Sequence, residues 1–512
     1  MEKRLMLSGE DKYKRPIGVL FSAKEGRRIT GQLKLKKGDI LDSNVVSIAD
    51  DKFFHVPEGG SLHGVSEAGM VSVLDCVRGG SFGSTTWADF TIHHEDLSFR
   101  YALFGMRHVA IEEECIRGIQ FTLEGTDTNV FMHDQLDKFG HLHNPDETIL
   151  DAIERTRPNY LRGEFVKGRA IVSYFTGHWN FLPRFETVLG TVHVGRLMQI
   201  GSFGRTVENI PRITIEFDQH PTTLERAWEK MRQIRQFFTW MMGYAPRWKD
   251  VLLFTSGVNE DGSRRDTDGD LEVFAPNEGE EVPEGRREYG TLIDASRHPD
   301  HFMEVMQNWL KRNSNAKRKS ANARFSSCFP GTARRVIEDG IVSAANTFDL
   351  LPDEDKPDAE PLPDSVLDIL ADTRRKAKSC MPPGAQRDDV LSALGRIGRN
   401  RRLRDIVEHR ADIVLDHFGN DRLKQLNHVI RLAVKCRNYY THGSSDEEPG
   451  DVDCADFEVV FFLTATLEFI YGTSELLLCE WNPATSARNR WHLLHGYIES
   501  YDAKRSMVLG LQ

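Results

Sequence analysis

Arg437, Asn438 and His442 are the side chains of this 512-residue chain whose types and spacing best suit catalysis. Arginine is always charged, and its planar fork of N–H donors matches the oxygens of a phosphate. Histidine exchanges protons near neutral pH, and the dipole at a helix C-terminus favours its charged form. Together these groups suit the stabilisation of charge that develops on a phosphate and the transfer of protons at neighbouring oxygens.

A single amphipathic helix is predicted to position these residues. Asp421 is its expected N-cap, and Gly443 is the residue just past its end. Apolar residues spaced by three and four indicate one buried face: Leu423, Leu426, Ile430 and Ala433. The next position on that face is Arg437, and a buried arginine requires a partner. A second row on the helix consists of Arg431, Lys435, Asn438 and His442.

The hexapeptide from Arg437 to His442, RNYYTH, resembles the R-x4-6-H motif of HEPN ribonucleases, in the form in which a polar residue follows the arginine. Its place at the end of an amphipathic helix, before an acidic loop and a long apolar helix, strengthens the resemblance. The β-rich region upstream is similar in general layout to the N-terminal domain of ApeA-type bacterial anti-phage proteins. The resemblance implies an all-α HEPN bundle that pairs as a homodimer, in which two motifs share one composite site.

The chemistry that this resemblance implies is RNA cleavage with neither a metal nor another cofactor. The RNA 2′-hydroxyl attacks the adjacent phosphate and leaves 2′,3′-cyclic phosphate and 5′-hydroxyl ends, so DNA should be spared. Arg437 is expected to stabilise the phosphate, His442 to transfer protons, and Asn438 to act as the polar residue of the motif. The candidate RNA contacts are Lys435, Arg431 and Tyr440.

The geometry of a straight helix separates the two motif residues. Residues five apart lie about 140° apart around an α-helix, so Arg437 and His442 of one chain face different ways. Either the helix unwinds at 441–443, or a second chain completes the site, as the family's dimer implies. Tyr439 and Tyr440 either stack on a base or contribute to core or dimer packing.

Charge is unevenly distributed along the chain. The net charge is −11 at pH 7, which argues against indiscriminate nucleic-acid binding. Residues 396–437 hold eleven Lys/Arg and five Asp/Glu, a net of +6, and residues 311–324 hold six basic residues and no acid. Residues 444–458 hold seven acids and no base. The basic segments are interpreted as a phosphate-gripping surface or as solvated helix faces, and the acidic segment as a shield of the basic site.

Composition indicates a soluble globular protein. Hydrophobic residues make up 39 %, and the mean hydropathy is −0.45. Seven cysteines occur with no CxxC pair, which favours reduced thiols and a cytoplasmic location. The first residues show no signal-peptide core. The most apolar stretch, 457–478, contains Glu458, Glu468 and Glu475, so it is predicted to be a buried bundle helix with no membrane span.

The predicted fold is α+β and multidomain. Residues 1–310 form a β-rich N-terminal sensor or regulatory domain, residues 311–330 a basic linker, and residues 331–505 the all-α HEPN bundle. Short strands separated by Gly- and Pro-bearing turns are expected at 17–21, 31–36, 71–77, 116–123, 171–175, 191–194, 213–217 and 251–254. Bundle helices are expected at 333–350, 365–379, 388–396, 403–418, 421–443, 457–478 and 491–501, with a Pro- and acid-rich linker at 352–364.

Two helices are predicted within or just after the β-rich region. The first begins at Thr222, which forms a capping box with Glu225, and ends at Met242 before the stop residue Gly243. The second covers 302–310, and the basic run 311–324 either continues it or links it to the next domain.

Other candidate sites are weaker. The segment 79–83 matches G-x-S-x-G, but no helix follows it, so a hairpin turn is predicted there and at the similar segment 201–204. The segment 266–270 lacks the glycine and glutamate positions of a calcium loop. Two acid- and histidine-rich clusters lack the usual metal-ligand spacing: His93, His94, Glu95 and Asp96, and His133, Asp134, Asp137, His141 and His143.

The favoured interpretation is a two-part anti-phage effector. A phage-derived trigger acts through the N-terminal domain, and the HEPN bundle then cleaves RNA such as tRNA loops in abortive infection. The alternative is a non-catalytic HEPN dimerisation or nucleotide-binding module, with an N-terminal domain that binds a carbohydrate ligand or a phage protein. The two differ in whether His442→Ala is tolerated.

Overall fold

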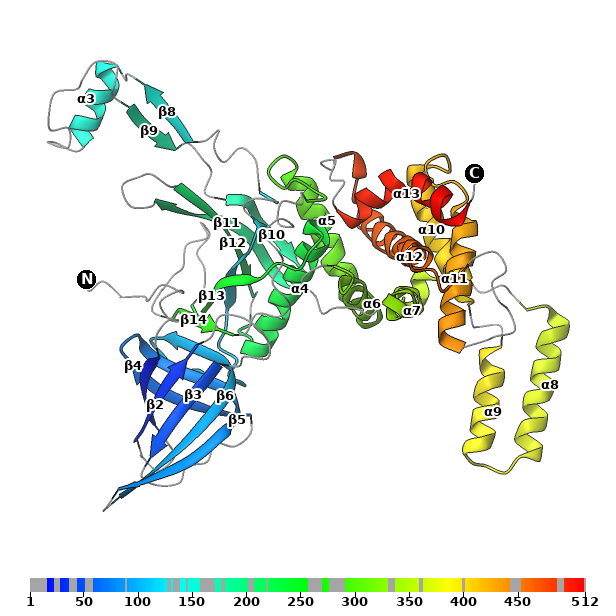
Figure 1. Cartoon of the computed structure of the whole chain (residues 1–512), viewed down its shortest axis with the longest axis horizontal. Coiled ribbons are helices and arrows are strands. Elements are labelled where there is room, and N and C mark those ends of the chain that lie inside the picture. The colour runs from blue at the N-terminus through cyan, green and yellow to red at the C-terminus, as the bar shows by residue number, and fades with distance from the viewer. Residues whose placement is uncertain are drawn as a thin grey trace. The chain divides into compact units, whose positions relative to one another are not determined.

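The computed structural model describes residues 16–22, 28–35, 44–50, 59–87, 90–126, 130–131, 139–143, 146–156, 171–175, 180–200, 207–217, 220–256, 269–275, 291–329, 337–358, 362–397, 401–442, 453–485 and 492–510. The chain divides into two compact units, Met1–Gln307 with Thr485–Ala487 and Asn308–Ala484 with Arg488–Gln512. The first unit is built on antiparallel strands and the second is helical (Figure 1). The predicted α+β class is therefore confirmed.

A closed ring of antiparallel strands opens the first unit. Side chains alternate between buried and exposed along β1, as a half-buried strand requires. Because β6 pairs with both β3 and β5, the order β6-β3-β2-β1-β4-β5 returns to β6. Apolar side chains fill the interior, among them Phe21, Leu33, Val73 and Phe99. The ring consists of β1 (Ile17–Ser22), β2 (Arg28–Lys34), β3 (Asn44–Asp50), β4 (Gly60–Ser66), β5 (Gly69–Trp87) and β6 (Phe90–Gly105).

The same sheet continues beyond the ring and carries a long helix. From β6 the strand order runs through β14, β13, β7, β12, β11 and β10. The helix α4 (Leu224–Met242) packs on it through Trp228, whose ring meets those of Tyr101 and Trp248 edge-on. The strands are β7 (Gly118–Leu123), β10 (Asn180–Thr187), β11 (Gly190–Ile200), β12 (Val207–Glu216), β13 (Trp248–Phe254) and β14 (Leu271–Phe274).

The start of α4 corrects the predicted capping box. Thr223 is the N-cap, and its hydroxyl accepts a hydrogen bond from the N–H of Arg226 at 3.4 Å. Thr222 instead forms a backbone bridge with Ile116. The predicted stop is confirmed, since Gly243 has a φ of 74° and donates its N–H to the carbonyl of Thr239.

The G-x-S-x-G segment is not the predicted hairpin turn. Residues 79–83 lie within β5, where the pairing with β6 shifts register between Arg78 and Phe82, so the segment forms a β-bulge. The segment 201–204 lies outside the described residues. The other elements of the first unit are α3 (Glu147–Thr156) and a two-stranded sheet of β8 (Phe139–His143) and β9 (Ile171–Phe175).

The second unit is a helical bundle built around α12 (Phe457–Leu477). This helix is apolar on nearly all sides, and it contacts α7, α10, α11 and α13. The surrounding elements are the end of α5 (Pro299–Asn313), α6 (Ala316–Ser326), α7 (Ile337–Asp349), η4 (Asp353–Asp355), α10 (Leu403–Phe418), α11 (Leu426–His442), η5 (Pro483–Thr485) and α13 (Leu493–Leu509).

Among the described residues, α12 is the one helix long and apolar enough to cross a membrane. Of its most apolar window, 78 % is buried inside the protein. That burial agrees with the prediction of a bundle helix at this position.

Two predicted bundle helices pack differently from the prediction. α8 (Asp364–Cys380) and α9 (Ala385–Arg396) pair with each other (Figure 1), and Arg374 donates to the carbonyl of Leu394 at 3.1 Å. None of the residues of α8, all of which are described, is buried, and Leu367 and Ile369 are exposed. The helices exist as predicted, but their apolar spacing does not place them in the core.

Two segments predicted as linkers have regular structure. The basic segment after residue 310 ends α5 and forms α6, whose N-cap Asn315 accepts hydrogen bonds from the N–H groups of Lys317 and Arg318. In the Pro- and acid-rich segment, Asp355 is buried within η4. Both segments are folded parts of the second unit because their charged side chains pair with one another.

Candidate active site

Helix α11 carries the predicted site residues, but it begins at Leu426 and not just after Asp421. Gln425 has a φ of 59°, in the left-handed region, so the helix cannot extend back through it. Asp421 is therefore not its N-cap. The predicted buried face is confirmed for Leu423, Leu426, Ile430 and Ala433. Gly443 lies outside the described residues.

The end of α11 that carries the motif stays helical through His442. Thr441 Oγ1 donates to the carbonyl of Arg437, one turn earlier, at 2.9 Å. The alternative in which the helix unwinds therefore fails for Thr441 and His442, and the two motif residues remain about 140° apart around the axis. The side chain of His442 lies outside the part of the chain that is described.

Amide oxygens from two helices hold Arg437. Its Nη2 donates to Oδ1 of Asn346 on α7 at 2.9 Å, and its Nη1 donates to Oδ1 of Asn438 at 3.1 Å. The side chain is 17 % exposed, so the predicted need for partners is met largely by neutral groups. Its Nε–H is buried and has no acceptor among the described residues. An unsatisfied donor of this kind leaves the hydrogen bonding of the guanidinium incomplete.

Asp349 adds a charged partner one turn after Asn346. Its Oδ2 lies 3.7 Å from Nη2 of Arg437, and its side chain is 47 % exposed, so water screens the pair. Burial raises the pKa of Asp349, although Arg437 and Lys356 pull it down, and the net shift is upward. Because water screens this pair, Arg437 keeps positive charge available for another anion.

Two of the three candidate RNA contacts on α11, Arg431 and Lys435, are exposed, as is the candidate catalytic residue Asn438. Arg431 Nε donates to the carbonyl of Asn427, within the same helix, at 3.3 Å. These side chains are accessible to a ligand, and Asn438 Oδ1 accepts a hydrogen bond from Arg437.

Tyr440 is engaged inside the protein. Its hydroxyl donates to the carbonyl of Cys454 at 2.6 Å, and its ring meets that of Tyr439 edge-on. This contact favours packing over base stacking for Tyr440. Tyr439 is partly exposed.

Asn346 and Asp349 could not be recognised from the sequence as partners of Arg437. They lie within a helix predicted at 333–350, three positions apart, and the contact from Asn346 to Arg437 spans 91 residues. Local periodicity does not report partners at that distance. The one signal in the sequence was that Arg437, on an apolar face, needed a partner.

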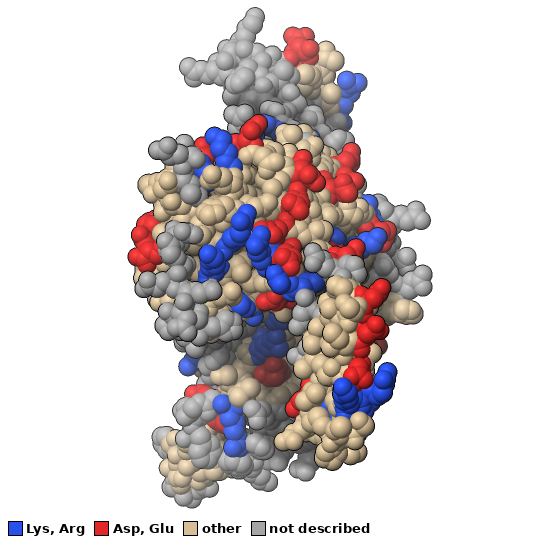
Figure 2. Space-filling model, turned by 90° about the vertical axis from the view of Figure 1, so that its right-hand side faces the viewer, with Lys and Arg blue, Asp and Glu red and all other residues tan. Residues whose placement is uncertain are grey.

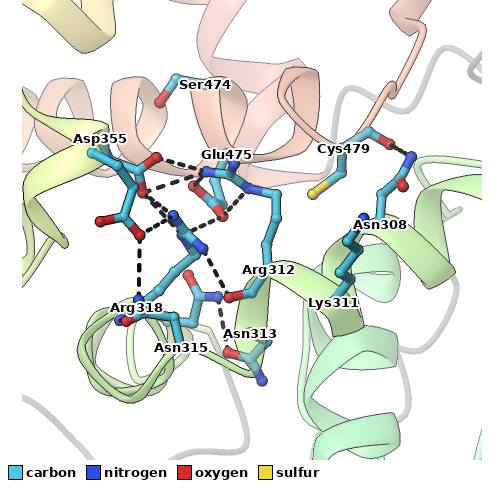
Figure 3. Close-up of polar contacts among 12 residues, drawn as sticks. Asn308, Lys311, Arg312, Asn313, Asn315, Arg318, Asp355, Ser474, Glu475 and Cys479 are labelled. Atoms are coloured by element: carbon cyan, nitrogen blue, oxygen red, sulfur yellow. Dashed lines mark hydrogen bonds and ion pairs between the residues drawn. The ribbon is translucent and has the colours of Figure 1, made fainter. Parts of the chain in front are cut away.

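A largely buried group of five charged residues stabilises the same unit, and Figure 3 labels four of them, Arg312, Arg318, Asp355 and Glu475. Arg312 Nε and Nη2 donate to the two carboxylate oxygens of Glu475 at 2.8 and 2.9 Å. Arg318 Nη2 donates to Asp355 at 2.6 Å, and Arg410 Nη2 donates to Glu475 at 2.7 Å. The Glu475 side chain is 0 % exposed. These five residues are called the ionic cluster below.

The ionic cluster joins α5, α6, η4, α10 and α12. Burying charges costs several kcal/mol per ion, which pairing only roughly offsets, so the cluster mainly favours one arrangement of these helices. Burial alone would raise the pKa of Asp355, but Arg312 and Arg318 lower it below its usual value. Asp355 lies six residues after Asp349. The cluster therefore anchors the chain just after α7, the helix whose Asn346 and Asp349 lie against Arg437.

Two features of the sequence relate to this cluster. The basic run at 311–324 was interpreted as a solvated or phosphate-gripping face, yet Arg312 and Arg318 are paired inside the protein. Glu475 stood out as an acid within an apolar helix. Such an acid is stable in a core only when it is paired, but the arginines that pair with Glu475 were not identified from the sequence.

The face of the molecule drawn in Figure 2 carries charges of both signs. On the described surface shown in Figure 2, Lys and Arg side chains are interspersed with Asp and Glu. Basic residues between 396 and 437 also form ion pairs: Arg401 with Asp353, Arg404 with Glu408, and Lys424 with Asp502. The net charge of that segment therefore overstates its attraction for phosphate. Most of the acidic segment, at 443–452, lies outside the described residues.

The histidine clusters do not form a metal centre in the described chain. Within those residues no group of three or more His, Cys, Asp or Glu is placed to hold a metal ion. His93 to Asp96 are consecutive on β6, where alternate side chains point to opposite faces. His133, Asp134 and Asp137 lie outside the described residues.

The fold and the site together define a β-rich domain joined to a HEPN-type helical domain. The sequence model of ApeA N-terminal domain 1 matches residues 17–309, more than half of the chain, and that of the Apea-like HEPN domain matches residues 343–483. The chain belongs to the ApeA family of HEPN-type anti-phage defence proteins. Neither a curated protein nor a solved structure gave a significant match.

Proposed function

We propose that this protein is a metal-independent endoribonuclease of the HEPN type. The observation that carries the proposal is the state of Arg437, which is mostly buried, held by neutral amides and left with an unsatisfied Nε–H at the family's motif. Such a guanidinium is suited to a phosphate that gains negative charge. HEPN domains are generally nucleases, and the family match extends through this motif.

In the proposed reaction the RNA 2′-hydroxyl loses its proton and attacks the adjacent phosphorus, and the P–O5′ bond breaks. His442 transfers the protons, while Arg437 stabilises the charge on the phosphate. The products are a 2′,3′-cyclic phosphate and a 5′-hydroxyl. Arg431 and Lys435 are proposed to bind neighbouring phosphates, because both are exposed on the same helix.

A homodimer is proposed to complete the site. Arg437 and His442 of one chain lie on different sides of a continuous helix. A second copy that brings its own motif to the same place supplies the missing partner, as in other HEPN domains.

The decisive experiment compares wild type with His442→Ala and Arg437→Ala on RNA in EDTA, with analysis of the product ends. We expect cyclic-phosphate and 5′-hydroxyl ends from wild type alone, and no cleavage of the matching DNA. A restrained enzyme would be inactive in vitro, so the same variants are also compared in phage-challenged cells. Equal protection of the cells against phage by wild type and by His442→Ala would refute the proposed nuclease function.

The physiological setting follows from the family. We propose that a phage-derived trigger acts through the N-terminal domain, that RNA (tRNA among it) is cleaved in the cytoplasm, and that the infected cell stops producing phage.

A second candidate function is a non-catalytic dimerisation or nucleotide-binding module. The observation that favours it is the engagement of Tyr440 in packing, and tolerance of His442→Ala would support it.

A further inference from the structure

Helix α7 contributes two side chains to Arg437, and they differ in charge and exposure. Asn346 is half-buried and neutral, and its Oδ1 accepts a hydrogen bond of 2.9 Å. Asp349 is charged and exposed, and it lies at 3.7 Å, too far for a hydrogen bond. The close and directional contact is thus made by the amide.

We infer that Asn346 is the positioning residue for Arg437, fixing its guanidinium so that the unengaged donors meet an RNA phosphate in one orientation. The inference rests on the proposed function for its catalytic consequence. Asn346 does not touch the substrate in this scheme, because it acts through Arg437.

Two hydrogen bonds are enough to fix the orientation of the Arg437 guanidinium. Asn438 accepts from Nη1 and Asn346 accepts from Nη2, so both ends of the guanidinium fork are held. Asn438 lies next to Arg437 on α11, so of these two hydrogen-bond acceptors Asn346 is the one that ties the fork to a different helix. An arginine has five N–H donors, so three are unengaged. The Nε–H among them is buried, so the phosphate is expected to meet the two free donors on Nη1 and Nη2.

The neutrality of Asn346 matters as much as its position. An amide oxygen orients the guanidinium without cancelling its charge, whereas a carboxylate at the same place would compete with the phosphate. Asp349 already supplies a screened negative charge nearby. A second one at position 346 is therefore expected to weaken substrate binding, although it would keep an acceptor in place.

The test separates orientation from charge with full-length variants and an oligoribonucleotide substrate. We expect Asn346→Ala to lower kcat by about 10- to 100-fold with little change in KM, because a misaligned group slows the reaction. We expect Asn346→Asp to retain a higher kcat than Asn346→Ala but to have a higher KM than wild type. We expect Asp349→Asn to have a lower KM than wild type. Asn427→Ala, an exposed asparagine of α11, is the control and should match wild type.

A merely structural role for Asn346 would give a different pattern. Ala and Asp at position 346 would then reduce activity in parallel with the melting temperature, with no split between kcat and KM. That pattern, or an unchanged kcat in Asn346→Ala, would overturn the positioning role of Asn346. The proposed nuclease function would still stand.

A second measurement does not depend on cleavage. In protein labelled with 15N-arginine, the Arg437 side-chain resonances are assigned by their loss in Arg437→Lys. We expect slow rotation of the guanidinium in wild type and fast rotation in Asn346→Ala. Equal rotation in the two proteins would overturn the positioning role. Slow rotation in a wild-type protein that never cleaves RNA would instead refute the proposed function alone.

Discussion

Arg312 and Glu475 are joined by two hydrogen bonds that engage both oxygens of the carboxylate, across 163 residues of sequence. The pair links the last turn of α5 to the end of α12, the central helix of the bundle. Two further arginines, Arg318 and Arg410, lie within ion-pair distance of the same carboxylate. Glu475 is thus the common counter-ion of three arginines, of which Arg318 and Arg410 are buried.

Replacing Glu475 with Gln should destabilise the second unit strongly. The change keeps the shape but leaves buried guanidinium groups without their charge partner, which costs about 3–5 kcal/mol. Thermal unfolding of the full chain measures the loss. The control is Glu408→Gln, which breaks the exposed pair with Arg404 on α10 and should cost about 0.5 kcal/mol or less. Equal shifts for the two variants would contradict the role given to the cluster.

Asp355 should make stability depend on acid pH. Its pKa is lowered in the folded protein, so its stabilising contribution is present above the unfolded value of about 3.9 and is lost as the pH falls through the folded value. The melting temperature of wild type should therefore fall more between pH 6 and pH 3.5 than that of Asp355→Asn. Parallel pH profiles would show that the carboxylate does not contribute in this way.

Arg437→Lys should separate charge from geometry at the site. Lysine keeps the positive charge but lacks the planar fork, so it cannot hold Asn346 and Asn438 while it donates to a phosphate. We expect the single-turnover cleavage rate to fall about 100-fold or more, as when one transition-state donor is removed. A lysine variant with full activity would mean that only the charge is needed.

Thiol reactivity should follow burial. Cys380 is exposed, whereas Cys436 and Cys454 are buried. Burial raises the pKa of both buried thiols, so their reactive thiolate is scarce at pH 8. In native protein, iodoacetamide should modify Cys380 first, and denaturation should make the other two react as fast. Peptide mapping over time measures this, and early labelling of Cys436 would contradict the packing of α11.

Local patterns were enough to predict where many elements lie. The helix expected at 403–418 has those bounds as α10, and the strand expected at 171–175 is β9. The packing partners of these elements were harder to predict, because they depend on residues far away in the sequence. The apolar spacing of α8 resembles that of a core helix, but α8 pairs with α9 and none of its residues is fully buried.

The candidate site could be predicted only in part for the same reason. The residue types and their place on α11 came from the sequence, as did the need of Arg437 for a partner. Asn346 could not be found, because a single amide in a helix 91 residues away carries no local signal. The start of α11 was also missed, since the positive φ of Gln425 is uncommon for a residue with a side chain.

The unbroken helix that carries Arg437 and His442 also has a consequence for genetics. In a shared site that takes its arginine from one chain and its histidine from the other, a mixed dimer of Arg437→Ala and His442→Ala chains still contains one intact pair. Two inactive alleles expressed together should therefore restore part of the phage resistance that neither gives alone. A site formed within one chain would show no such complementation, so a plaque assay on cells that carry both alleles distinguishes the two arrangements.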